Sequence, residues 1–174
     1  MIRENPMRPV RAGSCYADAE AARRAIDLVR PMVAAALEDA EICASGSCCA
    51  VVVDPAVTPQ GGATFHDAVL VEEDFDTSPR WDADHSAFAH AKARTAWLHG
   101  QDGLGLLARS PCLLREGDSL LRGAVSLDGI VVAVSGFTPP YDEAIALAIA
   151  AGLRAAAMTR LEAARERHAQ VVGA

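Results

Sequence analysis

Apolar residues recur every three or four positions after Asp18, and this spacing predicts an amphipathic helix. The apolar face of that helix is formed by Ile26, Val29, Val33 and Leu37. Asp18 is expected to cap the first turn, because a short carboxylate accepts hydrogen bonds from the free N–H groups there. Pro31 interrupts the pattern and is expected to kink or divide the helix.

Short apolar runs predict the strands. Residues 48–54 form a continuous run that ends before Pro55, as expected of a strand buried on both faces. A second strand is expected between Asp67 and Glu73, followed by an acidic, irregular segment to Asp84.

The clearest local pattern predicts a hairpin. Residues 123–127 and 130–135 are apolar runs separated by Asp128 and Gly129. A type I′ turn requires positive φ at both central residues, and an Asp-Gly pair accommodates this requirement. These two runs are therefore expected to pair as antiparallel strands.

Two further long helices are expected. An alanine-rich segment predicts the first, from His85 to about His99, capped by Asp82 or Asp84 and ended by Gly100. The apolar face of this helix is expected to hold Phe88, Ala91, Thr95 and Leu98. A short helix is expected near residues 104–109. The last long helix is expected to open at Asp142 and Glu143, with an apolar body to Met158 and a charged tail to His168.

The order helix, strands, helix, hairpin, helix predicts an α+β fold with a mainly antiparallel sheet and packed helices. We expect one domain over residues 18–168. An N-terminal arm over residues 1–17 precedes it, and a C-terminal tail over residues 169–174 follows it.

Composition narrows the class of protein. The net charge of −7 leaves no basic stripe for phosphates, so nucleic acid is not an expected partner. No membrane span is expected, because the most apolar segment, residues 144–151, is short. The N-terminus has no apolar segment, which favours a cytoplasmic location. Alanine accounts for 36 of the 174 residues. Because alanine buries little area, we expect homo-oligomer contacts to supply part of the stability.

Two segments carry a resemblance to a known family. Residues 91–96, Ala-Lys-Ala-Arg-Thr-Ala, form the first segment. Residues 128–136, followed by Pro139 and residues 142–146, form the second. Both look like motifs of the haem-binding-protein-like family, a DUF336-type domain that includes the glycolate-operon protein G. With tolerance for an insertion, the resemblance spans residues 19–157.

The resemblance implies a profilin-like, three-layer α/β/α arrangement in a homo-oligomer. It also implies a small-molecule ligand, with haem as one candidate cofactor. The chain departs from the family pattern in two places. Residues 55–84 form a longer segment without the family's Arg-Met-Asp-Gly run, and Phe137 stands where the family has a second glycine. A phenylalanine at that turn changes the shape of a pocket.

Lys92 is the only lysine and lies in the first matched segment. It is expected either to contact an anion or act as a catalytic amine, or to be an ordinary surface lysine. Thr95 lies one turn further on, so both side chains can face one cleft. The resemblance implies a threonine near a haem iron here, and the alternative is a hydroxyl bonded to its own helix.

The turn after the hairpin is the second candidate region. Ser135, Gly136 and Thr138 are candidate ligand-binding residues, because backbone N–H groups at a helix start suit a carboxylate or phosphate. Asp142 and Glu143 oppose an anion there. They are expected to cap the helix, coordinate a cation or transfer protons.

His66 lies near several carboxylates, namely Asp67, Glu72, Glu73 and Asp74. An imidazole among carboxylates suits metal binding or general-base catalysis, and a solvated acidic loop is the alternative. No metal site is predicted from this pattern. His85, His90 and His99 lack the spacing of a metal pair and are expected to be exposed or capping.

The five cysteines are expected to be mostly free thiols. Cys48 and Cys49 are expected to be buried on opposite faces of one strand.

The leading hypothesis is a soluble protein of the haem-binding-like family. It would bind a small ligand between the Lys92/Thr95 helix and the Ser135–Asp142 turn. The alternative is an enzyme that transfers protons on a small organic acid or an aromatic-derived metabolite. Its catalytic groups would be Lys92, Asp142, Glu143 or His66. A non-catalytic accessory or assembly protein is the third hypothesis.

Overall fold

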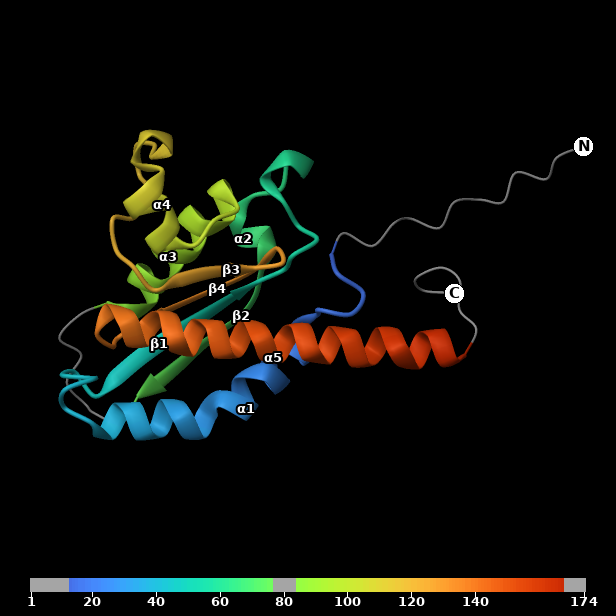
Figure 1. Ribbon diagram of the computed structural model, residues 1–174, viewed down its shortest axis with the longest axis horizontal. Coiled ribbons are helices and arrows are strands. Elements are labelled where there is room, and N and C mark those ends of the chain that lie inside the picture. Colours follow the sequence, from blue (N-terminus) through green and yellow to red (C-terminus); the bar gives the residue numbers. More distant parts are fainter. Residues whose placement is uncertain (1–12, 77–83, 168–174) are drawn as a thin grey trace, which may run out of the picture.

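The computed structural model describes residues 13–76 and 84–167 and contains one antiparallel sheet between two layers of helices (Figure 1). The strand order is β2-β1-β4-β3. The strands are β1 (Ser47–Val53), β2 (Val69–Asp76), β3 (Ala124–Leu127) and β4 (Ile130–Ser135). The predicted α+β class is confirmed, as is the three-layer arrangement.

The helices divide between the two faces of the sheet. On one face lie α1 (Ala19–Glu38) and α5 (Pro139–Glu166), and on the other lies α3 (His85–His99) (Figure 1). The shorter helices α2 (Phe65–Ala68) and α4 (Gly103–Arg109) lie near α3. Single 3₁₀ turns occupy Pro59–Gly61 and Pro111–Leu113.

Strand β1 is buried along its whole length, as its apolar run predicts. Alternate residues point to opposite faces, so Cys48 joins the core under α1 and α5, whereas Cys49 joins the core under α3. The prediction that the two cysteines are buried on opposite faces is therefore confirmed. The hairpin is also confirmed, since Asp128 and Gly129 have φ values of 51° and 85° between β3 and β4.

Helix α1 begins where the sequence predicts. Asp18 accepts a hydrogen bond from Ala21 N at 2.9 Å. Of the two effects expected of Pro31, a kink or a division, the division does not occur, because α1 is a single helix through that residue. Pro31 is exposed, so the carbonyl that its missing N–H leaves free can be hydrated by water.

Helix α3 has the predicted bounds, with Asp84 capping Ala87 N at 2.9 Å and Gly100 following in the left-handed region. The predicted apolar face is wrong at Phe88, which is 41% exposed, whereas Thr95 of the same face is buried. Ala89, Ala93 and Ala96 are fully buried instead. Small side chains on that face let the helix lie close to the valines of the sheet.

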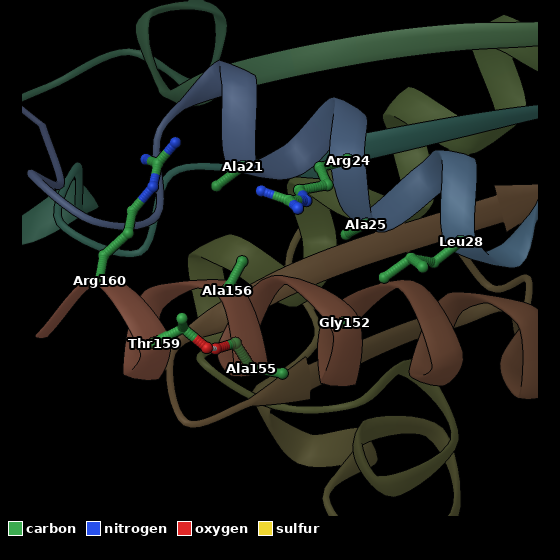
Figure 2. A pocket seen from close by; sticks show the side chains of 9 residues that line it. All are labelled: Ala21, Arg24, Ala25, Leu28, Gly152, Ala155, Ala156, Thr159 and Arg160. Atoms are coloured by element: carbon green, nitrogen blue, oxygen red, sulfur yellow. Dashed lines mark hydrogen bonds between the residues drawn. The ribbon is translucent and has the colours of Figure 1, made fainter. Parts of the chain in front are cut away.

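Helix α5 starts at Pro139, three residues before the predicted start. A proline fits the first helical position, because its fixed φ is helical and no N–H is needed there. Figure 2 shows a groove between α1 and α5, where Ala25 lies near Gly152. A Cβ atom on Gly152 would lie 3.2 Å from Ala25 Cβ, so small residues permit this close packing.

Within the described residues, α5 is the one helix long and apolar enough to cross a membrane by length and composition. Residues 144–151, the segment singled out in the sequence, are only part of this apolar stretch, and the absence of a membrane span remains a prediction. Ile145, Ile149 and Leu153 of α5 are buried against the sheet and α1. A core helix of a layered domain passes the same test of length and composition.

The structure describes the predicted N-terminal arm only from Gly13. The predicted tail over residues 169–174 lies outside the described residues, as does Asp82, the other predicted cap of α3. Asp54, at the end of β1, accepts hydrogen bonds from Ser14 N at 3.0 and 3.1 Å and from Ala56 N at 2.8 Å. This carboxylate ties the described end of the arm to the sheet. The domain boundaries remain a prediction.

Candidate functional site

A buried ion pair joins the two segments that the sequence singled out. Lys92 Nζ on α3 lies 2.8 Å from Asp142 Oδ2 on the first turns of α5, and their side chains are 4% and 3% exposed. Lys92 Nζ also donates to Val134 O at 2.9 Å. Asp142 Oδ1 accepts from Phe137 N at 3.0 Å. The pair therefore connects α3, the end of β4 and the start of α5.

Two glycines make room for this pair. At Gly123, φ is +115°, and a Cβ atom would lie 2.9 Å from Lys92 Nζ and 2.8 Å from Asp142 Cβ. At Gly136, φ is +140°, and a Cβ atom would lie 2.5 Å from Cys48 Cβ. A side chain at either position would collide with the neighbouring segment, so the close approach of strand, turn and helix depends on both glycines.

The protonation of Asp142 is set mainly by its burial. Burial raises the pKa of Asp142 to about 6, against the opposing effects of the Lys92 ammonium and the Phe137 N–H. A carboxyl group with a pKa near neutrality beside an ammonium can gain or lose a proton close to physiological pH.

The ion pair borders a shallow pocket of about 220 Å³. Its walls combine apolar side chains with charged groups from α3, the segment before β3 and the turn before α5. The apolar lining residues are Phe88, Leu121, Phe137 and Pro139, and the polar ones are His85, Lys92, Arg122, Ser135 and Asp142. Gly136 completes the lining.

Arg122 forms a two-point ion pair with Glu143 at the side of this pocket. Its Nε and Nη2 donate to the two carboxylate oxygens at 2.9 and 2.8 Å. The Arg122 side chain is 36% exposed. Glu143 itself borders a second groove, beside β3 and α4, rather than the pocket at Lys92.

The other predicted site residues lie in different surroundings. Thr95 does not line the pocket: its hydroxyl donates to Ala91 O at 3.0 Å and accepts from Ser119 N at 2.8 Å. Thr138 is exposed, and it precedes α5 as the cap residue. His66 is exposed on α2 and does not line the pocket either.

Most backbone N–H groups of the turn are already engaged. Phe137 N donates to Asp142, Thr138 N donates to Ile42 O at 2.9 Å, and Asp142 N donates to Thr138 O at 3.1 Å. Pro139 and Pro140 have no N–H. A ligand at this turn therefore meets side chains rather than free backbone donors.

Sequence reasoning did not identify Arg122 or His85 as pocket residues. Arg122 precedes the hairpin, and nothing in its sequence surroundings marks it. The expectation that the histidines are exposed or capping is wrong for two of them. His85 is 8% exposed, with Nε2 3.2 Å from Ser45 Oγ. The His99 side chain is 3% exposed and lies 2.6 Å from Asp118 Oδ2.

No family model matches the sequence, and no curated protein matches it. Among solved structures, protein ORFY of Klebsiella pneumoniae, a DUF336 protein, is similar with a TM-score of 0.50 at 16% identity, over 89% of this chain and 97% of that one. The structure of a PduOC:heme complex has a TM-score of 0.48 at 19% identity, over 81% and 94% of the two chains. HbpS has a TM-score of 0.48 at 20% identity, over 87% and 96%.

Identities this low establish a shared fold and not a shared ligand. The match to ORFY extends over nearly the whole of both chains, and the motif resemblance led to the same family independently. The chain therefore has the α+β fold of a DUF336 protein.

Proposed function

We propose that this protein is a member of the haem-binding-like family that binds a small organic anion in the pocket beside Lys92 and Asp142. The observation that carries the proposal is the composition of the pocket. Apolar walls from Phe88, Leu121 and Phe137 suit the carbon skeleton of a ligand, and Arg122 suits a carboxylate.

Arg122 is the group best placed to recognise the anion. Its two-point contact with Glu143 uses Nε and Nη2, so Nη1 has no partner among the described residues. Lys92 Nζ, in contrast, already donates to Asp142 and Val134 O. We therefore assign first contact with the ligand to Arg122 and a positioning role to Lys92, which holds the Asp142 turn against α3.

Haem, the cofactor that the resemblance implies, does not fit this pocket in a single chain. The pocket volume of about 220 Å³ lies below the ~300–1,000 Å³ typical of sites for drug-sized ligands. Phe137 contributes its ring to the lining where the family pattern has glycine. A ligand smaller than haem is favoured.

Thermal-shift and calorimetric titrations with aliphatic and aromatic carboxylates test the proposal, with the matching amides as uncharged controls. Arg122→Gln is expected to weaken carboxylate binding about 10-fold or more. Arg154→Gln, which removes an exposed ion pair with Asp128 instead, is expected to leave it unchanged. Binding of the amides as tight as that of the acids would contradict an anion site. A stoichiometric Soret shift with hemin would contradict the size argument.

A proton-transfer enzyme is the second candidate, because a carboxyl group with a pKa near 6 borders the pocket. Among the predicted catalytic groups, Lys92 and Asp142 border it, whereas Glu143 and His66 do not. Incubation with a bound organic acid in D₂O, followed by proton NMR, tests this candidate. Loss of an α-proton signal with the wild type but not with Asp142→Asn is expected. Equal exchange with both proteins would refute a role for Asp142.

We also propose that the protein is a cytoplasmic homo-oligomer. Support comes from a groove beside the edge strand β3, lined by Leu104, Val125, Leu127 and Leu147. Leu104 and Leu147 are 40% and 48% exposed. Light scattering with size-exclusion chromatography is expected to give a multiple of 18.2 kDa. Leu147→Glu is expected to reduce that mass, and a monomeric wild type would refute the assembly.

A further inference from the structure

The outer edge of the sheet carries a cluster of metal-binding residue types that the proposed function does not use. Cys49 on β1 pairs with Asp74 on the edge strand β2. Glu72 lies two residues before Asp74, so both carboxylates point to the same face of the sheet as Cys49. This is the face covered by α3.

Strand geometry brings the three ligand atoms together. The Cys49 Sγ and one carboxylate oxygen each from Glu72 and Asp74 all lie within 4.8 Å of one another. The thiol is buried, with Cys49 at 0% exposure, and the two carboxylates face solvent. An ion can therefore enter from the solvent side and reach the thiol between the carboxylates.

Helix α3 holds one of the carboxylates in place. His90 Nε2 lies 3.0 Å from Glu72 Oε2, and Ser86 Oγ donates to the other oxygen of the same carboxylate. Carboxylate ligands of protein metal sites are commonly oriented by hydrogen bonds of this kind. The hydrogen bonds from Ser86 and His90 therefore fix the orientation of the Glu72 carboxylate.

The opposite face of the same strand shows how an ordinary acidic residue is neutralised here. Glu73, between Glu72 and Asp74, accepts from Arg30 Nη2 at 2.9 Å. Within residues 13–76 and 84–167, no lysine or arginine pairs with Glu72 or Asp74. Glu72 and Asp74 therefore lie beside a buried thiol without a lysine or arginine partner among the described residues. The basic side chain that contacts them there is His90, at Glu72.

We propose that Cys49, Glu72 and Asp74 bind a divalent transition-metal ion, with Zn²⁺ as the best match and with His90 positioning Glu72. One sulfur and two oxygen ligands suit Zn²⁺ better than Mg²⁺ or Ca²⁺, which prefer oxygen alone. Zn–S and Zn–O bonds of about 2.3 and 2.1 Å place ligand atoms roughly 3.5 Å apart. Rotation of the exposed Asp74 side chain would close that spacing while Cys49 and the anchored Glu72 stay fixed.

Metal binding requires the thiol to lose its proton. The ion replaces that proton, which leaves to solvent, and water completes the coordination. Affinity is accordingly expected to rise with pH.

Cobalt titration of the full chain under reducing conditions tests the site. Co²⁺ is expected to give a near-ultraviolet charge-transfer band that reports a thiolate ligand, and Zn²⁺ is expected to abolish it. Cys49→Ser is expected to lose the band. Cys48→Ser is the matched control, because Cys48 is equally buried on the same strand but faces α1 and α5.

Carboxylate variants keep the proposal falsifiable if Cys49→Ser does not fold. Glu72→Gln and Asp74→Asn, each at an exposed position, are expected to weaken Zn²⁺ at least 10-fold in competition with a chromophoric chelator. Glu73→Gln on the other face is expected to leave the affinity unchanged. A charge-transfer band that survives in folded Cys49→Ser, equal effects of the Glu72 and Glu73 variants, or no band with the wild type would overturn the site.

Discussion

Replacing Lys92 with methionine isolates the buried ion pair. Methionine preserves the length of the side chain but removes the ammonium that lies 2.8 Å from Asp142 Oδ2. Among the described residues, the Asp142 carboxylate then keeps only the Phe137 N–H as a hydrogen-bond donor, at a position where its side chain is 3% exposed. A carboxylate would remain buried without a counter-charge.

The expected loss of stability is large. Removing one member of a buried pair costs about 3–5 kcal/mol, because the remaining charge keeps its desolvation penalty. A loss of that size lowers the melting temperature by about 10 °C in a domain of this length. The double variant Lys92→Met/Asp142→Asn removes both charges, so it is expected to recover most of the loss.

The loss should depend on pH with a definite sign. Burial raises the pKa of Asp142 to about 6 from an ordinary value of 3.8, which corresponds to about 3 kcal/mol in favour of the protonated form. The folded state therefore loses stability as pH rises through this interval. Without Lys92 the pKa of Asp142 rises further, so the stability deficit of Lys92→Met should be small at pH 5 and full at pH 8.

Urea unfolding followed by circular dichroism at pH 5 and pH 8 measures both effects. Arg154→Met is the control, because its ion pair with Asp128 is half-exposed and is expected to be worth less than about 1 kcal/mol. Two results would refute this reasoning about an unpaired buried carboxylate. One is a loss of unfolding free energy in Lys92→Met below about 1 kcal/mol at pH 8. The other is a loss of equal size at both pH values.

Two further predictions concern backbone contacts, one at Gly136 beside the site and one at Asp54, which holds the N-terminal arm. Gly136→Ala is expected to cost about 3 kcal/mol or more in urea unfolding, because its Cβ would lie 2.5 Å from Cys48 Cβ, whereas Gly62→Ala, with open space around it, is expected to cost about 1 kcal/mol. Equal losses would exclude the collision as the cause. Asp54→Ala removes the acceptor of the Ser14 N–H and is expected to lower the free energy of unfolding by about 1–3 kcal/mol. Hydrogen exchange at the Ser14 amide is expected to become faster. Unchanged exchange there would show that other contacts hold the arm.

Elements whose formation depends on neighbouring residues were predictable. Asp18 and Asp84 cap α1 and α3 as their positions imply, and Asp128-Gly129 forms the hairpin turn. These features involve residues at most four positions apart, so the sequence contains the interaction in full. The predicted start of α5 was three residues too late, because Pro139 was assigned to the preceding turn rather than to the first position of the helix.

Features that depend on packing were not predictable. The periodicity of α3 placed Phe88 on the buried face, yet Phe88 is exposed and Ala89, Ala93 and Ala96 pack against the sheet. The sequence left two alternatives for Thr95, and the structure shows the one in which its hydroxyl bonds its own helix, with Ser119 N as a further partner. Arg122 and His85 were not recognised as pocket residues, because residues distant in the chain supply the rest of the lining.

Lys92 and Asp142 show most clearly which properties the sequence determines and which depend on the tertiary structure. The sequence by itself determined that both residues lie in segments of a recognisable family pattern, one as the only lysine and one at a helix start. Only the tertiary structure decided that they meet, across 50 residues, because β4 carries the chain from the hairpin to the N-terminus of α5 beside α3. Burial then determines their chemistry, since the same carboxyl group in water would keep an ordinary pKa.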